Sequence, residues 1–209
     1  MPDYRAQGIM APEPRPGMKP FSEVEHSCRK AGVLLLLYPH KSRLNLVLTR
    51  RTDGLDNHRN QISLPGGQIE AEETAQEAAI RETEEELGVP GKLFRSLGSL
   101  TPLYIPPSHF CIYPTVAFSP EKPDFKPCHR EVSDVIEIPI RHLLDRKNSR
   151  RENRMIRGIE TNVPFYIFNE CRIWGATAMV LSEFLVILKG SGDPRDTISP
   201  KNQCLNDGS

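Results

Sequence analysis

The sequence predicts a domain of the mixed α/β class, in which strands and helices share one core, and three stretches support this prediction. Residues 31–38 and 44–50 are apolar runs too short to cross a membrane, which indicates a buried strand followed by an alternating strand. Residues 65–89 begin with a Gly-Gly turn, continue as a helix rich in carboxylates and end at Gly88, which suits a helix C-terminus. Residues 177–189 carry apolar side chains broad enough for a helix that covers the sheet.

The first 20 residues contain five prolines, so an ordered helix or a central strand is not expected through most of this arm. The arm could be a tail, or it could lie along a neighbouring subunit of a homodimer. A short helix is expected within residues 21–30, with Ser22 as N-cap and Glu25 completing a capping box. We therefore divide the chain into a Pro-rich arm (1–20), one domain (21–189) and a flexible tail (190–209).

Further elements of both kinds follow the carboxylate-rich helix. Two strands are expected around a proline-bearing loop, and a third strand ends at Pro139 because proline cannot extend a paired strand. A short helix, a solvated basic loop and a hairpin come next. The expected ranges are 92–103 and 111–118 for the first two strands, 131–138 for the third, 140–144 for the helix, 146–153 for the loop, and 164–168 with 171–174 for the hairpin.

Composition limits the partners of the protein. A chain of 209 residues is long enough for one sizeable domain with extensions. Its 27 Lys and Arg residues balance its 27 Asp and Glu residues, so no bulk attraction to nucleic acid or to an anionic membrane follows. The N-terminus has no basic stretch followed by an apolar core, and no apolar run is long enough to span a bilayer. We expect a cytoplasmic protein without nucleic-acid or membrane partners.

The five cysteines point to a reducing compartment. They are scattered, odd in number and without CxxC spacing, which argues against a disulfide framework and against a zinc site. They are Cys28, Cys111, Cys128, Cys171 and Cys204.

The carboxylate-rich helix carries the candidate site. At about 100° per residue, Glu82, Glu85 and Glu86 fall within roughly one third of the helix circumference. Three alanines share this stripe, which indicates a closely packed face, whereas Arg81 and Glu84 lie toward the opposite side. Like charges on a packing face repel one another and lose hydration, so a hard divalent cation among them is the obvious candidate. A solvated, Glu-rich helix is the alternative interpretation.

The spacing from Gly67 onward resembles the signature of the Nudix hydrolase family, G-x5-E-x7-R-E-U-x-E-E-x-G-U, where U is aliphatic. Thr83 stands at an aliphatic position and is the sole departure. The resemblance implies a Nudix fold, with a mixed β-sheet between helices and the signature as a loop-helix-loop. It also implies that Glu82, Glu85 and Glu86 hold Mg²⁺ or Mn²⁺. The residues expected to support the motif are Gly67, Glu73, Arg81 and Gly88, and Val89 completes the match.

The segment before the signature resembles the extension of the coenzyme A pyrophosphatases within that family, L-L-T-x-R-S-x3-R-x3-G-x3-F-P-G-G. Asp56 stands where that pattern has Arg, and Asn60 stands where it has Gly. Arginine suits phosphate because it binds bidentately. The matching residues are Leu48, Thr49, Arg51, Pro65, Gly66 and Gly67, and the expected substrate-binding residues are Arg51, His58, Arg59, Gln61 and Gly66.

The resemblance implies hydrolysis of a nucleoside diphosphate linked to another moiety. Coenzyme A or acyl-CoA would give phosphopantetheine, or its acyl form, and adenosine 3′,5′-bisphosphate. Glu131 stands at the start of the strand expected over 131–138, where members of the family often have an additional acid. The expected catalytic residues are therefore Glu82, Glu85, Glu86 and Glu131. Two alternatives stay open: a pyrophosphatase for ADP-sugars, dinucleotides or modified nucleotides, and a binding module that recognises a nucleotide without cleaving it.

Overall fold

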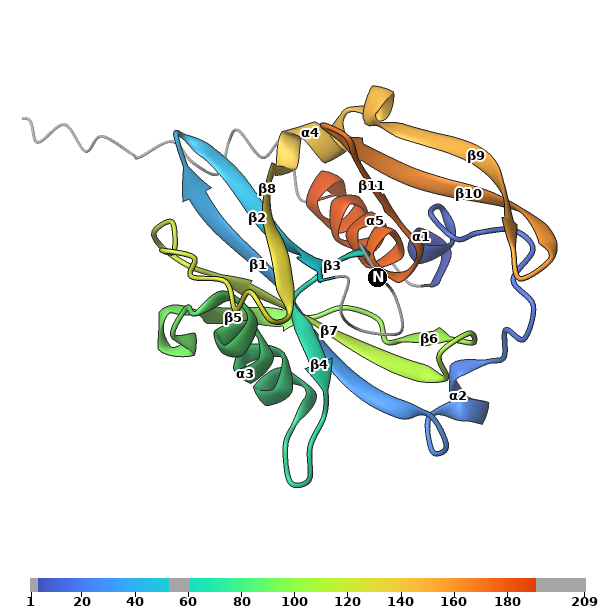
Figure 1. Cartoon of the computed structure of the whole chain (residues 1–209), viewed down its shortest axis with the longest axis horizontal. Helices are drawn as coiled ribbons and strands as arrows, with labels where there is room; N and C mark the ends of the chain where they lie inside the picture. Colours follow the sequence, from blue (N-terminus) through green and yellow to red (C-terminus); the bar gives the residue numbers. More distant parts are fainter. Residues whose placement is uncertain (1–3, 53–60, 191–209) are drawn as a thin grey trace, which may run out of the picture.

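The computed structural model describes residues 4–52 and 61–190 of the chain. Strand β1 (Arg29–His40) lies in the middle of an eight-stranded sheet whose main path runs β3-β2-β1-β7-β5 (Figure 1). It pairs antiparallel with β2 (Arg43–Arg51) and parallel with β7 (Phe110–Phe118), so the sheet is mixed. The predicted α/β class and the first two predicted strands are confirmed.

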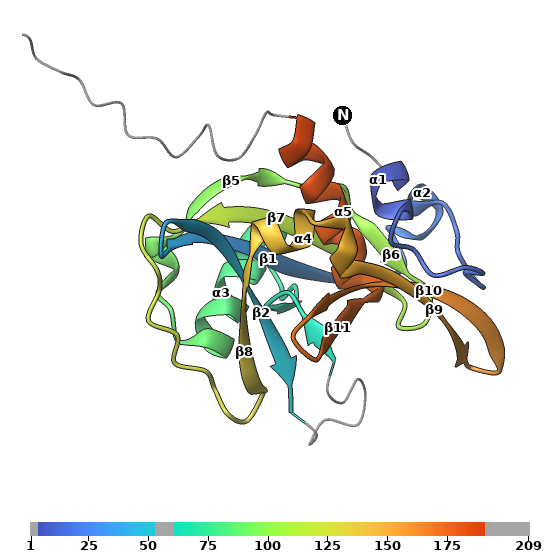
Figure 2. The same cartoon turned by 90° about the horizontal axis from the view of Figure 1, so that it is seen from above.

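The two faces of β1 are buried under different helices, which explains why this strand is apolar throughout. Leu34 and Leu36 belong to the cluster beneath helix α3 (Ala75–Leu87). Leu35 and its i+2 neighbour Leu37 belong to the cluster beneath helix α5 (Gly175–Gly190). Figure 2 shows α3 and α5 on opposite sides of the sheet. Strict alternation along β1 therefore fixes which helix each leucine meets.

The remaining strands of the large sheet are short or lie at its periphery. Strand β4 pairs with β1, β6 pairs with β7, and β8 pairs with β2. The range 92–103, predicted as one strand, is broken near Pro102, which has no N–H for a ladder, and Thr101 donates its N–H to Glu183 instead. The bounds are β3 (Ile62–Ser63), β4 (Gly66–Gln68), η1 (Gly91–Leu93), β5 (Arg95–Ser99), β6 (Leu103–Ile105) and β8 (Val132–Pro139).

A second, three-stranded sheet contains β9 (Ser149–Ile156), β10 (Ile159–Phe168) and β11 (Cys171–Trp174). It follows α4 (Ile140–Leu144) and η2 (Arg146–Asn148). The predicted short helix and hairpin are confirmed, but the predicted loop over 146–153 is wrong. The strand β9 occupies most of this range, and its backbone pairs with β10. Most of its side chains are charged or polar and face solvent, so the sequence shows no apolar pattern that would indicate a strand.

The N-terminal arm packs against the body of the protein. It contains helix α1 (Tyr4–Gly8), whose Gln7 Nε2 donates a hydrogen bond of 2.9 Å to the buried Glu183 of α5. Ser182 Oγ donates to the carbonyl of Ala6 at 2.7 Å. The arm is thus held by polar contacts that the abundance of proline in the sequence did not reveal.

The short helix that follows the arm, α2 (Phe21–Val24), begins at a different residue from the one predicted. Its N-cap is Pro20, and no side chain caps it, so the predicted capping box of Ser22 and Glu25 does not form. Further upstream, Glu13 and Asn162 exchange two backbone hydrogen bonds, which attach the arm to β10.

One disulfide bond joins Cys28 to Cys111. The expectation that the cysteines form no disulfide is therefore wrong for this pair. The reason is the parallel register of β1 and β7, which pairs Arg29 with Phe110 and so brings two distant cysteines together. Cys128 and Cys171 are free thiols, and Cys204 lies outside the described residues.

Among the helices of residues 4–52 and 61–190, none is long and apolar enough to cross a membrane. Of the predicted flexible tail, Gly190 ends α5 and the rest lies outside the described residues.

Gly32 sets the distance between β1 and α3, which yields a testable prediction. A Cβ atom at this position would lie 2.1 Å from the Ala75 carbonyl oxygen and 2.9 Å from the Ala79 nitrogen, both backbone atoms that cannot rotate away. We expect Gly32→Ala to lower the free energy of unfolding by about 3 kcal/mol in urea titrations. Gly8→Ala is the control, because a Cβ there meets no atom within 4 Å. Equal stabilities of the two variants would contradict this account.

Candidate active site

Helix α3 is fixed at both ends by local interactions. At its start, Thr74 Oγ1 accepts a hydrogen bond from the Glu77 N–H, and Glu77 Oε2 accepts one from the Thr74 N–H, which is a capping box. At its end, Gly88 adopts a left-handed φ of 65°, as its position predicts. The acidic side chains are therefore presented from a rigid element.

Glu86 lies at the seam between α3 and the sheet. Only 3% of the residue is exposed, and its Oε2 accepts a hydrogen bond of 3.3 Å from the Gly66 N–H. Burial raises the pKa of this carboxyl to about 8, the nearby Arg51 acts in the opposite direction, and Glu82 and Glu131 raise the pKa further. The negative charge of an ionised Glu86 is thus only partly balanced by positive groups of the protein.

Glu82 lies beside Gly67. A Cβ atom at Gly67 would come within 2.3–2.5 Å of the Glu82 carboxylate carbon and both its oxygens. Burial raises the pKa of Glu82, Arg81 opposes this change, and Glu85 and Glu131 add to it. The four acids of the expected catalytic set therefore lie in one electrostatic neighbourhood.

Arg81 supplies the positive charge of this neighbourhood. Its guanidinium holds both oxygens of Glu73, at 2.8 and 3.0 Å, and also bonds the Glu82 carboxylate at 2.8 Å. Glu85 lies 3.5 Å away from it. The helical projection placed Arg81 away from these acids, and this is wrong for the guanidinium, because the long side chain bends back over them.

Glu84 and Glu85 differ as the helical projection predicts. The Glu84 carboxylate turns away from the acidic cluster and accepts a hydrogen bond from the Gly91 N–H. The Glu85 side chain is 56% exposed and reaches toward Arg81. These adjacent glutamates therefore provide a matched pair for mutagenesis.

The donor chemistry of the cluster fits a hard divalent cation. Carboxylate oxygens are the ligands that Mg²⁺ and Mn²⁺ prefer, and crowded, partly buried carboxylates are stabilised by a cation. As the side chains stand, no three His, Cys, Asp or Glu residues in the described part of the chain are gathered closely enough to hold an ion. Arg81 forms ion pairs with Glu82 and with the more exposed Glu85, so the charges of these two carboxylates are partly neutralised without an ion.

The predicted substrate-binding residues are only partly described. Arg51 ends β2 next to Glu86, and its N–H donates to the carbonyl of Gln61 at 3.1 Å. Gly66 contributes the N–H that contacts Glu86. His58 and Arg59, like the pattern departures Asp56 and Asn60, lie outside the described residues.

Sequence reasoning missed two residues that assemble the site. Thr52 donates its N–H to the Glu131 carbonyl at 3.0 Å, which brings this acid to the end of β2. Gly32 allows α3 to approach β1. No local pattern identifies Thr52, whereas a glycine within an apolar strand is a recognised sign of close backbone approach.

Comparison with known proteins identifies the family. A model of the NUDIX domain matches residues 29–158, which is more than half of the chain. The chain belongs to the Nudix family. An uncharacterized Nudix hydrolase, NudL of Photorhabdus laumondii, is 30% identical over 78% of this chain and 87% of its own length. NudL of Yersinia enterocolitica is 31% identical over 81% of this chain and 84% of its own length. The prediction of a Nudix hydrolase is confirmed.

Solved structures agree with this fold. A Nudix hydrolase of M. smegmatis, RenU, superposes with a TM-score of 0.53 at 16% identity, over 84% of this chain and 90% of its own. The MutT protein of Methanosarcina mazei gives a TM-score of 0.51 at 15% identity, over 77% and 94%. The Nudix arrangement of a mixed sheet between helices is thus shown for this chain.

Gly66 and Gly67 yield a paired prediction. At Gly67 a Cβ would strike only the flexible end of Glu82, so we expect Gly67→Ala to fold normally and to lose at least tenfold in turnover because it displaces that carboxylate. At Gly66, with φ of 146°, a Cβ would lie 2.3 Å from the Gly32 carbonyl oxygen, so Gly66→Ala should destabilise the fold itself. Thermal melts and activity assays of both variants distinguish the two effects. Full activity in Gly67→Ala would contradict the placement of Glu82.

Burial of Glu86 predicts how stability depends on pH in metal-free protein. Its folded pKa of about 8 exceeds the usual value of 4.5, so its contribution to stability is complete below pH 4.5 and is lost as the pH rises through 8. Glu86→Gln removes this loss. We expect the stability of the variant relative to the native protein to increase by about 4 kcal/mol between pH 5 and pH 9 in EDTA, as measured by urea titrations. A difference that does not change with pH would contradict the burial argument.

Proposed function

We propose that this protein is a divalent-metal-dependent hydrolase that cleaves the diphosphate of a nucleoside diphosphate linked to another moiety, with coenzyme A or an acyl-CoA as the leading substrate. The observation that supports the proposal is the buried Glu86, which the Gly66 N–H contacts at 3.3 Å and whose ionisation is influenced by the charges of Glu82, Glu131 and Arg51. Carboxylates with an arginine at their border are suited to a cation and a polyphosphate together.

Nudix hydrolases generally use divalent metal ions, and Mg²⁺ or Mn²⁺ is the proposed cofactor here, with Glu82, Glu85 and Glu86 as the residues that would hold it. A bound ion would lower the pKa of water and neutralise charge on the phosphoryl oxygens. Arg51 would orient a phosphate by paired N–H donors. Arg81 is proposed to support the motif, since it joins Glu73 and Glu82 across the loop-helix junction.

Glu131 is the proposed proton acceptor. Its side chain makes no hydrogen bond or ion pair within residues 4–52 and 61–190, while Glu82 is held by Arg81 and Glu86 by Gly66. A carboxylate without a partner among the described residues, whose charge acts on two other acids, can take a proton from an attacking water at little cost in local interactions.

The leading substrate rests on the resemblance of residues 48–67 to the coenzyme A pyrophosphatases. Within this stretch, Arg51 and Gly66 both border the acidic cluster. The product pair would be phosphopantetheine, or its acyl form, and adenosine 3′,5′-bisphosphate. A cytoplasmic location and a homodimer stay predictions, and the Cys28–Cys111 disulfide opposes the argument for a reducing compartment that the cysteine pattern supplied.

Two neighbouring glutamates test the assignment of the ligands. We expect Glu85→Gln to lower kcat by at least a hundredfold, because it removes a charged ligand, whereas Glu84→Gln should stay within threefold of the native rate. Steady-state assays with Mg²⁺ measure both variants. Equal losses of activity in the two variants would contradict the assignment of Glu85, and not Glu84, as a ligand on α3.

A substrate panel tests the specificity. Coenzyme A, an acyl-CoA, ADP-ribose, a dinucleotide and nucleoside triphosphates are incubated with the native protein and Mg²⁺ or Mn²⁺, and products are separated by chromatography. We expect the highest kcat/KM for coenzyme A or its acyl ester. A higher value for ADP-ribose or a dinucleotide would favour the alternative pyrophosphatases, and no turnover of any compound would favour a binding module.

A further inference from the structure

A cavity that is separate from the acidic cluster lies between the N-terminal arm and the body of the protein. Its volume is about 690 Å³, which is within the range of small-molecule sites. The wall is formed by α1, by residues 15–20 of the arm, by α2 with its C-cap Glu25, by β6 and by Met179 of α5. No residue of the acidic cluster on α3 lines it, and Figure 1 shows α3 and the arm at opposite ends of the molecule.

Gln7 forms a fixed part of the cavity wall. The residue is 1% exposed, and its Nε2 is held by the Thr101 carbonyl at 2.8 Å and by Glu183 at 2.9 Å. Its Oε1 is buried without a hydrogen-bond partner among the described residues. That oxygen has almost no accessible surface, so Gln7 anchors α1 to the body and is not itself a contact for a ligand.

Positive charge predominates over negative charge around the cavity. Arg15 and Lys19 line it, opposed by one acid, Glu25. The Arg15 side chain forms no ion pair or hydrogen bond in the part of the chain that the structure describes, and burial lowers the pKa of its guanidinium. A partly desolvated arginine that forms no ion pair among the described residues favours an anion.

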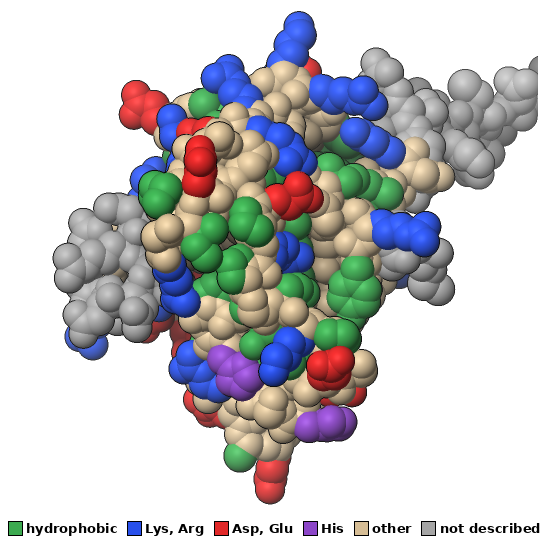
Figure 3. Space-filling view, turned by 90° about the vertical axis from the view of Figure 1, so that its right-hand side faces the viewer, with side chains coloured by type: hydrophobic (Ala, Val, Ile, Leu, Met, Phe, Trp, Pro, Cys, Tyr) green, Lys and Arg blue, Asp and Glu red, His purple; other side chains and the backbone are tan. Residues whose placement is uncertain are grey.

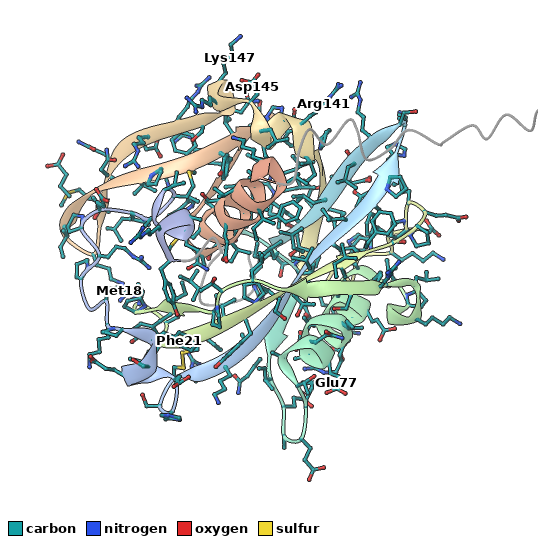
Figure 4. The ribbon with its side chains drawn as sticks, turned by 180° about the vertical axis from the view of Figure 1, so that it is seen from behind. Met18, Phe21, Glu77, Arg141, Asp145 and Lys147 are labelled. Carbon is teal, nitrogen blue, oxygen red and sulfur yellow. A yellow bond between two sulfur atoms is a disulfide. The ribbon has the colours of Figure 1, made fainter. Side chains whose placement is uncertain are left out.

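The rest of the wall is apolar. Phe21, Leu103 and Met179 contribute to it, and the exposed Met18 and Tyr4 lie at its border. Figure 4 shows Met18 and Phe21 close together, away from Glu77 on α3. On the side of the molecule that carries the arm, apolar side chains gather in patches with Lys and Arg between them (Figure 3). Such a wall suits an aromatic or aliphatic body rather than a bare inorganic ion.

We propose that this cavity binds a small amphipathic anion. Its acidic group would lie near Arg15 and Lys19, and its apolar body would lie against Met18 and Phe21. The family model matches residues 29–158, so most of this site is built by residues outside the matched segment. The site is thus independent of the proposed hydrolysis.

The test uses the fluorescent probe 8-anilinonaphthalene-1-sulfonate, which combines a sulfonate with aromatic rings. The probe is titrated into the full chain and into four variants. Arg15→Gln and Met18→Glu alter the cavity at positions that are partly or well exposed, so folding should be retained. Arg43→Gln removes an exposed arginine elsewhere, and Arg51→Gln alters the acidic cluster instead.

We expect saturable binding that weakens at least tenfold in Arg15→Gln and Met18→Glu and stays within twofold in Arg43→Gln and Arg51→Gln. Displacement of the probe by octanoate would assign a carboxylate with an alkyl body, and displacement by adenosine 5′-monophosphate would assign a nucleotide phosphate. The proposal is overturned if binding is not saturable, if the cavity variants bind like the native chain, or if inorganic phosphate alone displaces the probe.

Discussion

The contact between the Glu86 carboxyl and the Gly66 N–H is the interaction on which the rest of the site depends. It joins the helix that carries the acids to the turn that precedes the helix, and it buries an ionisable group between two layers. Two glycines make this contact possible. Gly66 has no Cβ to strike β1, and Gly32 has none to strike α3, so the helix, the turn and the central strand approach within van der Waals distance. Larger residues at either position would push the acids away from the sheet.

The free-energy cost of burying the Glu86 carboxylate bears on the proposed binding of a cation. Glu86, Glu82 and Glu131 raise one another's electrostatic energy, and Arg81 compensates for part of it through Glu82. A site of this kind is most favourable when a cation is present, which couples metal binding to the stability of the loop-helix-loop. Arg81 also holds Glu73, so the same guanidinium joins a residue proposed to support the motif to one proposed to hold the cation.

Local patterns made much of this architecture predictable. Alternation in β1 and β2, periodicity in α3 and α5, and the positive φ of Gly88 each follow from neighbouring residues. The acids on α3 were found by spacing alone. What could not be predicted depends on long-range pairing: the Cys28–Cys111 disulfide follows from the register of β1 with β7, and β9 exists because β10 offers it a backbone ladder. Likewise, Glu131 reaches the site through a backbone bond to Thr52, and Arg81 reaches it by the bend of a flexible side chain.

The central claim is that the buried Glu86 is a ligand of the catalytic cation, and calorimetric titration of Mn²⁺ into metal-free protein tests it most directly. The account predicts saturable binding to the native chain, at least tenfold weaker binding to Glu86→Gln, and native affinity in Glu84→Gln, whose carboxylate faces Gly91. Native affinity in Glu86→Gln would contradict the account, because the buried carboxyl would then have no part in holding the ion.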